Sequence, residues 1–359
     1  MIYSSAFARR KTATILSVLM IVAVSAVVLA QTSQTNPHNK ATPAGTGQVG
    51  TFDVQMINFT PWNTETDSSG IFLDKFEDYS GVIGFQVLDD KILYLDDYHG
   101  IVDVDRKSGK KVKNLYFFPF VNNFVFEDGK YYINSSEHSI DVYDVTGKLL
   151  NVFPYPRKLF SDQMVRYNGS TYVIFHKEDA NYQFLGKASF PIDDNGKIGT
   201  TVEGVVDQSG NILVDIHQTD QLGYSRINTA SSFIKTATGK TFIKNLANLL
   251  NQGDIIGLSS NRIFVRRVEY PSEGVERIFL QSYAFDKKKG IGDKLAEIEI
   301  PFISTPFYAN IPTGEFSVSP DGMIYKVIAN EKGVFMFSLK EAKYNEPHTG
   351  FPSILEIPK

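Results

Sequence analysis

The sequence predicts an all-β fold, a β-propeller of six blades with four antiparallel strands each, with seven blades as the alternative count. Three observations support this. The 359 residues include 27 Phe and 18 Tyr but one Trp, and aromatic residues favour strands. From about residue 51, short apolar runs alternate with turn residues. A strand-and-turn unit also recurs about 39 residues apart.

The repeat is clearest in two successive stretches. Apolar runs at 91–95 and 101–105, followed by a glycine turn at 108–110, recur at 130–133, 139–143 and 146–148. Each unit reads as strand, tight turn, strand, loop, strand, glycine turn and strand. One such sheet cannot bury both of its faces, whereas radial stacking buries each face on a neighbour.

The first hairpin turn of this unit recurs down the chain, at Asp89-Asp90, Asp128-Gly129, Asn168-Gly169, Ser209-Gly210, Ser260-Asn261 and Asp321-Gly322. Asp-Gly and Asn-Gly suit primed hairpin turns, which need positive φ at both central residues. A second turn carries a glycine, at Gly109, Gly147, Gly196, Gly239 and Gly290. Six first turns predict six blades.

Closing the ring requires a strand from one terminus to complete a blade built by the other. The alternating run at 52–59 is favoured as the outer strand of the last blade, and 353–357 is the alternative. The one helical candidate is the short segment 244–251.

Two turns carry a resemblance. The segment from Asp105 to Lys110 and the run Ser319-Pro320-Asp321-Gly322 resemble turns of the NHL-like and quinoprotein-like propeller repeats. The resemblance spans roughly residues 81–340. It implies a propeller fold and no particular activity.

The N-terminus differs from the rest of the chain. Arg9, Arg10 and Lys11 precede an uncharged run at 12–30 that ends in small residues, the layout of a secretory signal peptide at 1–30. The alternative is an uncleaved membrane anchor at 12–30. A flexible linker at 31–50 and a single propeller domain at 51–359 then follow. We therefore expect an exported protein, periplasmic or extracellular.

The absence of cysteine and the net charge bear on the type of exported protein and on its partners. The chain has no Cys, so no disulfide holds it, which favours a bacterial exported protein. The net charge is −4. Without residues 1–30 it is −7, from 33 basic and 40 acidic residues. Nucleic-acid binding needs clustered Lys and Arg, so we expect no nucleic-acid partner.

Four histidines follow the blade period. His99, His138, His176 and His217 are 39, 38 and 41 residues apart, near the turns between second and third strands. Imidazole is a common ligand of transition metals, so a divalent metal site is one hypothesis. The alternative is a solvated rim, because the four positions are not equivalent and such turns lie far from the axis. We predict no other cofactor.

Aromatic and proline residues mark the connections between blades: Phe118, Pro119, Phe120, Tyr155, Phe302, Phe307 and Tyr308. Connections of this kind on one propeller face suit a protein or peptide partner, or a small ligand. The alternative is that these side chains pack between the blades as core.

The leading functional hypothesis is a non-catalytic, extracytoplasmic propeller that binds a protein, peptide or other ligand. The alternative is a propeller enzyme, a metal-assisted lyase or hydrolase with His and Asp or Glu around the channel mouth. The sequence has no Gly-x-Ser-x-Gly nucleophile elbow and no phosphate-binding glycine loop. Acidic pairs such as Asp89-Asp90 and Asp193-Asp194 are favoured in turns for backbone reasons.

Overall fold

The structure is a computed structural model. The chain divides into two units, Met1–Gly47 and Gln48–Lys359, and the described residues all belong to the second unit. The structure describes residues 49–63, 71–72, 82–96, 100–115, 121–156, 161, 163–178, 184–214, 217–219, 225–227, 233–235, 241–242, 253–259, 261–272, 275–286, 290–301, 316–330 and 332–352.

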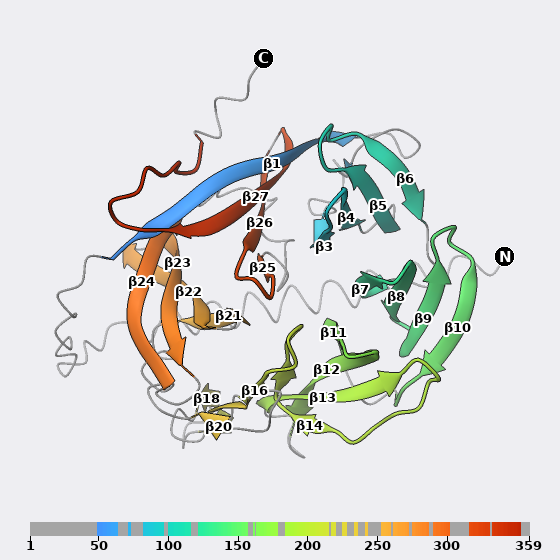
Figure 1. Cartoon of the computed structure of the whole chain (residues 1–359). Coiled ribbons are helices and arrows are strands. Elements are labelled where there is room, and N and C mark those ends of the chain that lie inside the picture. Colours follow the sequence, from blue (N-terminus) through green and yellow to red (C-terminus); the bar gives the residue numbers. More distant parts are fainter. Residues whose placement is uncertain are drawn as a thin grey trace. The chain divides into compact units, whose positions relative to one another are not determined.

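Within Gln48–Lys359, the described residues form strands and turns. Five antiparallel sheets have four strands each, and a sixth sheet has five. The sheets are arranged around a common axis (Figure 1). The fold is therefore a β-propeller, as predicted. Six first turns predicted six blades of four strands, and the structure shows five such sheets and a larger closing sheet.

The first two sheets, blades 1 and 2, match the predicted repeat closely. Blade 1 comprises β3 (Val82–Val87), β4 (Lys91–Asp96), β5 (Gly100–Asp105) and β6 (Lys111–Leu115). Blade 2 comprises β7 (Val121–Glu127), β8 (Lys130–Ser135), β9 (Ser139–Asp144) and β10 (Leu149–Pro154).

Blades 3 and 4 depart from the regular meander. Blade 3 comprises β11 (Gln163–Tyr167), β12 (Ser170–Glu178), β13 (Phe184–Asp193) and the short β14 (Val202–Glu203). Blade 4 has four short strands, β15 (Val205–Val206), β16 (Ile212–Val214), β19 (Phe233–Lys235) and β20 (Thr241–Phe242). A separate two-stranded hairpin lies between β16 and β19 in the chain, formed by β17 (His217–Thr219) and β18 (Ser225–Ile227).

Blade 5 and the closing sheet carry the longest strands. Blade 5 comprises β21 (Asp254–Ser259), β22 (Arg262–Ser272), β23 (Val275–Asp286) and β24 (Gly290–Ile300). The closing sheet comprises β25 (Phe316–Val318), β26 (Ile324–Asn330), β27 (Gly333–Ala342), β1 (Thr51–Asn63) and β2 (Ile71–Phe72), which is parallel to β1.

The N-terminal strand closes the ring. β1 pairs antiparallel with β27 from Thr51↔Ala342 to Pro61↔Gly333, so the first and last strands of the propeller share one sheet (Figure 1). This confirms the favoured candidate at 52–59. The alternative at 353–357 lies outside the described residues, as does the helical candidate at 244–251.

The first hairpin turns are of three kinds, which corrects the expectation of primed turns throughout. Positive φ at both central residues occurs at Asp128-Gly129 and Asn168-Gly169. In the turn before β16, φ is positive only at Gly210, and the Asp207 carboxylate accepts the N–H groups of Ser209 and Asn211. An aspartate side chain can hold a turn in this way without a primed backbone. Neither Asp89 nor Asp90 has positive φ.

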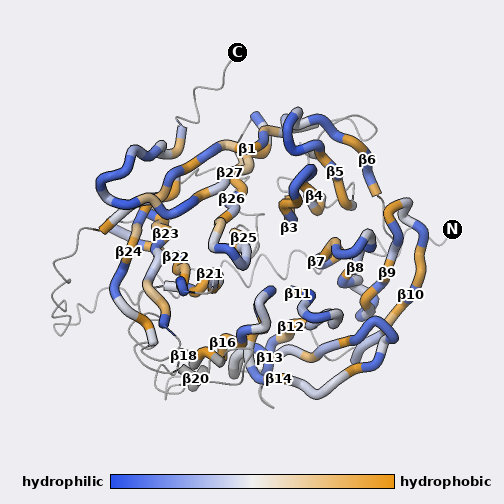
Figure 2. Tube along the Cα trace, viewed as in Figure 1, coloured by the Kyte–Doolittle hydropathy of each residue, from blue (hydrophilic) through white to orange (hydrophobic). Residues whose placement is uncertain are grey.

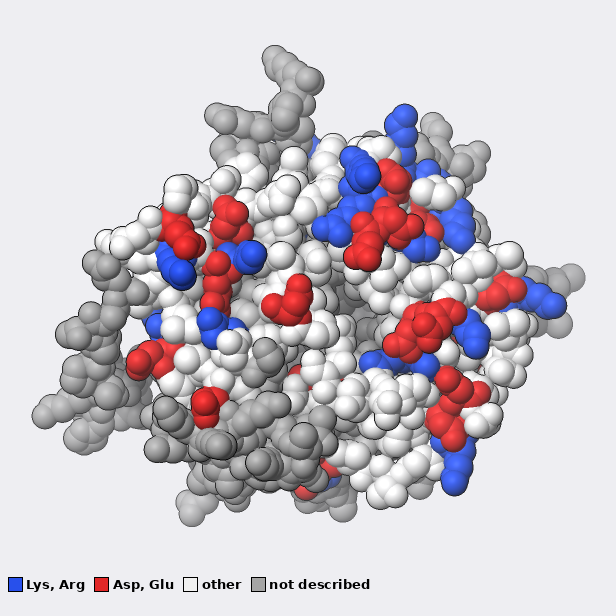
Figure 3. Space-filling model, in the orientation of Figure 1, with Lys and Arg blue, Asp and Glu red and all other residues white. Residues whose placement is uncertain are grey.

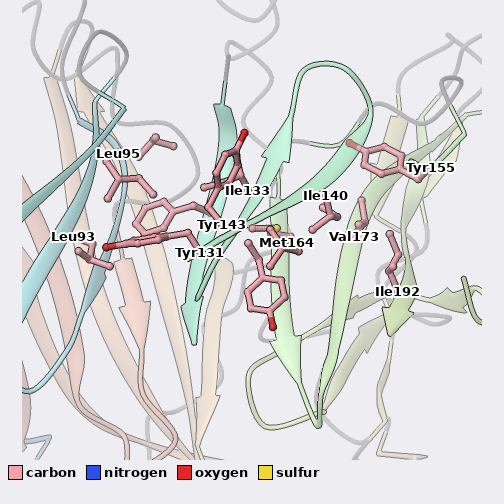
Figure 4. Packing of buried hydrophobic residues seen from close by; sticks show 14 of the residues in the cluster. Leu93, Leu95, Tyr131, Ile133, Ile140, Tyr143, Tyr155, Met164, Val173 and Ile192 are labelled. Atoms are coloured by element: carbon pink, nitrogen blue, oxygen red, sulfur yellow. The ribbon is translucent and has the colours of Figure 1, made fainter. Parts of the chain in front are cut away.

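The core consists of alternate strand residues from adjacent blades. One cluster joins Leu93, Leu95 and Ile101 of blade 1 to Tyr131, Ile133 and Tyr143 of blade 2, and continues to Met164, Val173 and Ile192 of blade 3. Figure 4 shows the labelled side chains of this cluster meeting between the sheets. Burial between blades replaces the disulfides that this chain lacks.

Polar contacts also join neighbouring blades. The Gln86 side chain of blade 1 binds the Phe126 backbone of blade 2 twice: its Nε2 donates to the carbonyl at 2.9 Å, and its Oε1 accepts from the N–H at 2.7 Å. Arg166 of blade 3 contacts Glu127 and Tyr132 of blade 2.

In the part of the chain that the structure describes, there is no helix with the length and hydrophobicity of a membrane span.

Candidate binding surface

The structure describes one of the seven predicted ligand-binding residues. Tyr155 is buried between His138 and Phe190, and its hydroxyl donates to Asn134 Oδ1 at 2.6 Å. Burial, with the nearby Asp141 charge adding to it, raises the pKa of Tyr155 to about 12. The Tyr155 ring therefore packs in the core between the blades, which was the alternative to ligand binding, and it is not accessible to a ligand. Phe118, Pro119, Phe120, Phe302, Phe307 and Tyr308 lie outside the described residues.

Two of the four predicted metal ligands have described side chains. His138 sits in the β8–β9 turn with a φ of 60° and meets the Tyr155 ring edge-on at 5.9 Å. His176 lies on an exposed position of β12. His99 and the side chain of His217 are not described. Within the described ranges, no three His, Cys, Asp or Glu side chains are grouped to hold a metal ion, and the metal site stays a prediction.

A buried carboxylate lies on β9, three residues after His138. Asp141 on β9 is 5% exposed and accepts the Ser139 hydroxyl at 2.6 Å. Burial raises the pKa of Asp141, and the nearby Glu137 charge raises it further. A carboxyl group in such an environment retains its proton more readily than one in water. By its raised pKa Asp141 fits the enzyme alternative, but its side chain is buried away from solvent.

The strongest surface feature is an apolar patch on the outer rim of blades 1 and 2. Five large apolar side chains are 42–62% exposed there: Val112 on β6, Val145 in the β9–β10 turn, and Leu149, Leu150 and Val152 on β10. Figure 2 shows the hydrophobic part of β10 at the outer edge of its sheet. Single exposed apolar residues are ordinary, whereas a group of them marks an interaction site. We call these five residues the β10 surface.

Contacts place the turn between β9 and β10 against β6 of the neighbouring blade. Lys113 Nζ on β6 donates to the Val145 carbonyl at 2.6 Å. A Cβ added at Gly147 would lie 3.2 Å from the Leu115 side chain. The β9–β10 turn therefore packs against β6, which brings Val145 of the β10 surface next to blade 1.

The edge of β10 differs from the edges of the other long outer strands. β10 has the uncharged sequence Leu-Leu-Asn-Val-Phe-Pro, and among the described residues no backbone hydrogen bond reaches its outer edge. Natural sheets usually cover or charge such an edge, because it can pair with another chain.

The other outer strands show both protective devices. β24 is covered by Gly50, whose N–H donates to the Leu295 carbonyl at 2.8 Å and whose carbonyl accepts from Glu297. β1 is covered where the Val54 N–H donates to the Thr349 carbonyl at 2.8 Å. β6 carries charged side chains, Lys111 and Lys113. Among the long outer strands in the described part of the chain, β10 is therefore the one whose edge is neither covered nor charged.

Positive charge borders one end of the β10 surface. Lys113 lies against the turn before β10, and the exposed Lys148 immediately precedes the strand. Asp144 in the same turn has its carboxylate occupied by the Thr146 hydroxyl and N–H and by the Lys148 N–H, which lowers its pKa. Asp144 therefore stays ionised, and this end carries two lysine charges against one aspartate charge. On the face drawn in Figure 3, basic and acidic groups are otherwise interspersed.

Sequence reasoning missed the β10 surface. The sequence placed Tyr155 in a connection between blades, and the two residues just before it, Phe153 and Pro154, in fact end β10. A signal was nonetheless present, since the run after Lys148 has the length of a strand and contains no charged residue. What the sequence does not show is that both faces of this strand stay exposed, because this depends on how the neighbouring blades pack.

Comparisons with known proteins leave the family open. No family model matches the chain, and no curated protein matches it. Among solved structures, a chain of the Mitotic Checkpoint Complex is similar, with 11% identity, coverage of 87% of this chain and 97% of that one, and a TM-score of 0.41. The computationally designed Ika8 protein has 12% identity, 71% and 83% coverage and a TM-score of 0.37.

A third similar structure is BBS1N in complex with ARL6DN, with 8% identity, coverage of 75% and 68%, and a TM-score of 0.31. Likeness at these values is too low to support an argument about activity or partners. The resemblance to NHL-like and quinoprotein-like repeats therefore stays an expectation, and the fold class rests on the sheets themselves.

Proposed function

We propose that this protein is an exported, non-catalytic β-propeller that binds a partner protein on the outer rim of blade 2. The exposed apolar side chains of the β10 surface carry the proposal. Interface cores are poor in charged residues and rich in large apolar ones. The apolar side chains lie beside an open strand edge, so they can be buried together with backbone groups.

The export part of the proposal rests on residues 1–30 and on the absence of cysteine from the whole chain. The basic cluster at Arg9, Arg10 and Lys11 and the uncharged run after it have the layout of a signal peptide. A rim patch on an exported propeller would face the partners of that compartment directly.

Site-specific photo-crosslinking in the source cells tests the binding function. A photoreactive amino acid at Val152 should give a discrete adduct with one protein, and the matched variant at Tyr270, which is 74% exposed on β22, should not. The purified partner should then bind the wild type and lose at least about tenfold in affinity with Leu149→Asp, because a charge is placed in an apolar interface. Equal adducts at both sites, or full affinity of Leu149→Asp, would contradict the proposal.

A further inference from the structure

Beyond a general interface, we propose that β10 binds its partner by strand addition: an extended segment of the partner pairs with the open edge of β10 and extends blade 2 to five strands. This rests on the proposed function and specifies its mode. The occupant is an extended, mainly apolar segment with acidic residues near its C-terminal end.

The backbone of β10 fixes which groups are free to pair. The Tyr155 N–H donates to the His138 carbonyl at 2.9 Å, so the backbone of Tyr155 faces β9. Along an antiparallel strand, residues alternate between facing the partner strand and facing away. By this alternation the backbone of Phe153, which lies opposite Ile140, also faces β9, and Val152 directs its N–H and carbonyl to the open edge.

The two ends of β10 set limits on the added strand. Pro154 has no N–H to donate, and the register shifts between Leu149 and Asn151, so the regular part of the edge is short. Phe153 is held at that end, because a Cβ at Gly196 would lie 2.4 Å from its ring. Pairing is thus centred on Val152, whose own side chain is exposed, as are those of Leu149 and Leu150 before it.

The chemistry of the occupant follows from the surroundings of the edge. Alternate side chains of an added strand would meet Val152 on one face, so apolar residues at alternate positions bury the most surface. An antiparallel strand would place its C-terminal end beside Leu149, where Lys113 and Lys148 lie. Acidic residues at that end complement these lysines.

The closing sheet shows the same kind of contact within this chain. The segment after β27 returns along the outer edge of β1, where the Val54 N–H donates to the Thr349 carbonyl and the Thr349 N–H donates to Asp53 Oδ1 at 2.8 Å. An outer propeller edge here is thus able to accept an additional extended segment that is anchored by one acidic side chain. On β10 the anchoring charges are reversed, with lysines on the propeller.

The test uses the whole protein and a synthetic peptide as probe. The peptide has ten residues, with valine and threonine alternating and two glutamates at the C-terminal end. Binding is measured by fluorescence anisotropy. We expect saturable binding, weakened roughly fivefold by Val152→Pro, which removes one backbone donor, with Val152→Ala as the matched control that keeps it. The same peptide with N-methyl groups on alternate amides should lose binding further.

Three outcomes would overturn the strand-addition mode. The first is an absence of saturable binding by the glutamate peptide. The second is equal binding by the N-methylated peptide, or equal effects of Val152→Pro and Val152→Ala when circular dichroism shows both variants folded. The third is a dimer in sedimentation that Val152→Pro abolishes, which would make a second copy the occupant. If strand addition alone fails, Leu149→Asp still weakens the crosslinked partner. If the binding function itself fails, that variant has no effect.

Discussion

The guanidinium of Arg166 lies 3.7 Å above the ring centroid of Tyr132, so that β11 of blade 3 is stacked on β8 of blade 2. The same side chain pairs with Glu127 at 2.5 Å and with Asp194 at 3.1 Å, and it is only 3% exposed. A charge that is so deeply buried is stable only while its partners remain in place.

Removing this side chain should loosen the junction between blades 2 and 3. We expect Arg166→Met to lower the free energy of unfolding by about 3 kcal/mol, because the stacking and the ion pairs are both lost. Arg166→Lys should recover part of this loss, since it keeps the charge but not the planar group. Urea denaturation monitored by tyrosine fluorescence measures both, and an unchanged midpoint for Arg166→Met would contradict the structural role.

The pair of hydrogen bonds between Gln86 of blade 1 and Phe126 of blade 2 should make stability depend on pH in the variant Gln86→Glu. Gln86 donates to the Phe126 carbonyl and accepts from its N–H. In Gln86→Glu, an ionised carboxylate would face that carbonyl without a proton to donate, which should cost about 2 kcal/mol at neutral pH. In acid the protonated side chain can donate again, so the loss should shrink. Gln86→Met, which cannot ionise, is the control and should show no such recovery.

Parts of this fold could be predicted from the sequence because they depend on local patterns. The repeat from 91 to 150 gives the strands of blades 1 and 2, and Asp128-Gly129 gives a primed turn. Ring closure by residues 52–59 was also predictable, since an alternating run precedes the first blade and needs a partner.

Other parts could not be predicted, because they join residues far apart in the chain. Glu127, Arg166 and Asp194 are 28 to 39 residues from one another along the chain where they bond, and no periodic pattern marks them. The cover of β1 by Thr349 joins residues almost 300 positions apart. Tyr155 shows the same limit at a predicted site, since its sequence fits both a surface loop and the core, and only its packing distinguishes them.

Two aspartates of β9 should affect stability in opposite directions. Burial raises the folded-state pKa of Asp141, so this group reduces stability as the pH rises from the unfolded value through the folded one. Asp141→Asn should therefore raise the melting temperature at pH 7, while its amide oxygen still accepts from Ser139, and the gain should vanish in acid.

Asp144 is the matched control on the same strand. Hydrogen bonds from Thr146 and Lys148 lower its folded-state pKa, so its stabilisation is present above the unfolded pKa and is lost as the pH falls through the folded one. Asp144→Asn should lower the melting temperature at pH 7 and have little effect in strong acid. Thermal melts from pH 2 to pH 8 measure both variants, and a shift of the same sign for the two would contradict the assignment.

A substitution in the β7–β8 turn can test how much the backbone conformation alone contributes to stability. Gly129 has a φ of 71°, and a Cβ added there would meet nothing within 4 Å. Gly129→Ala should thus cost about 1–2 kcal/mol through conformational strain and not through a clash. Gly129→Asn should cost less, because asparagine tolerates positive φ. Chemical denaturation compares the two, and equal losses would argue against the primed geometry.

Hydrogen exchange of the backbone amides tests the open edge of β10 most directly. In the free protein, the Val152 N–H should exchange quickly, whereas the Val54 N–H, which donates to Thr349, should be protected. Adding the glutamate peptide should slow exchange at Val152 and leave Val54 unchanged. Protection of Val152 in the free protein, or its unchanged exchange with the peptide bound, would contradict the open edge and its proposed role.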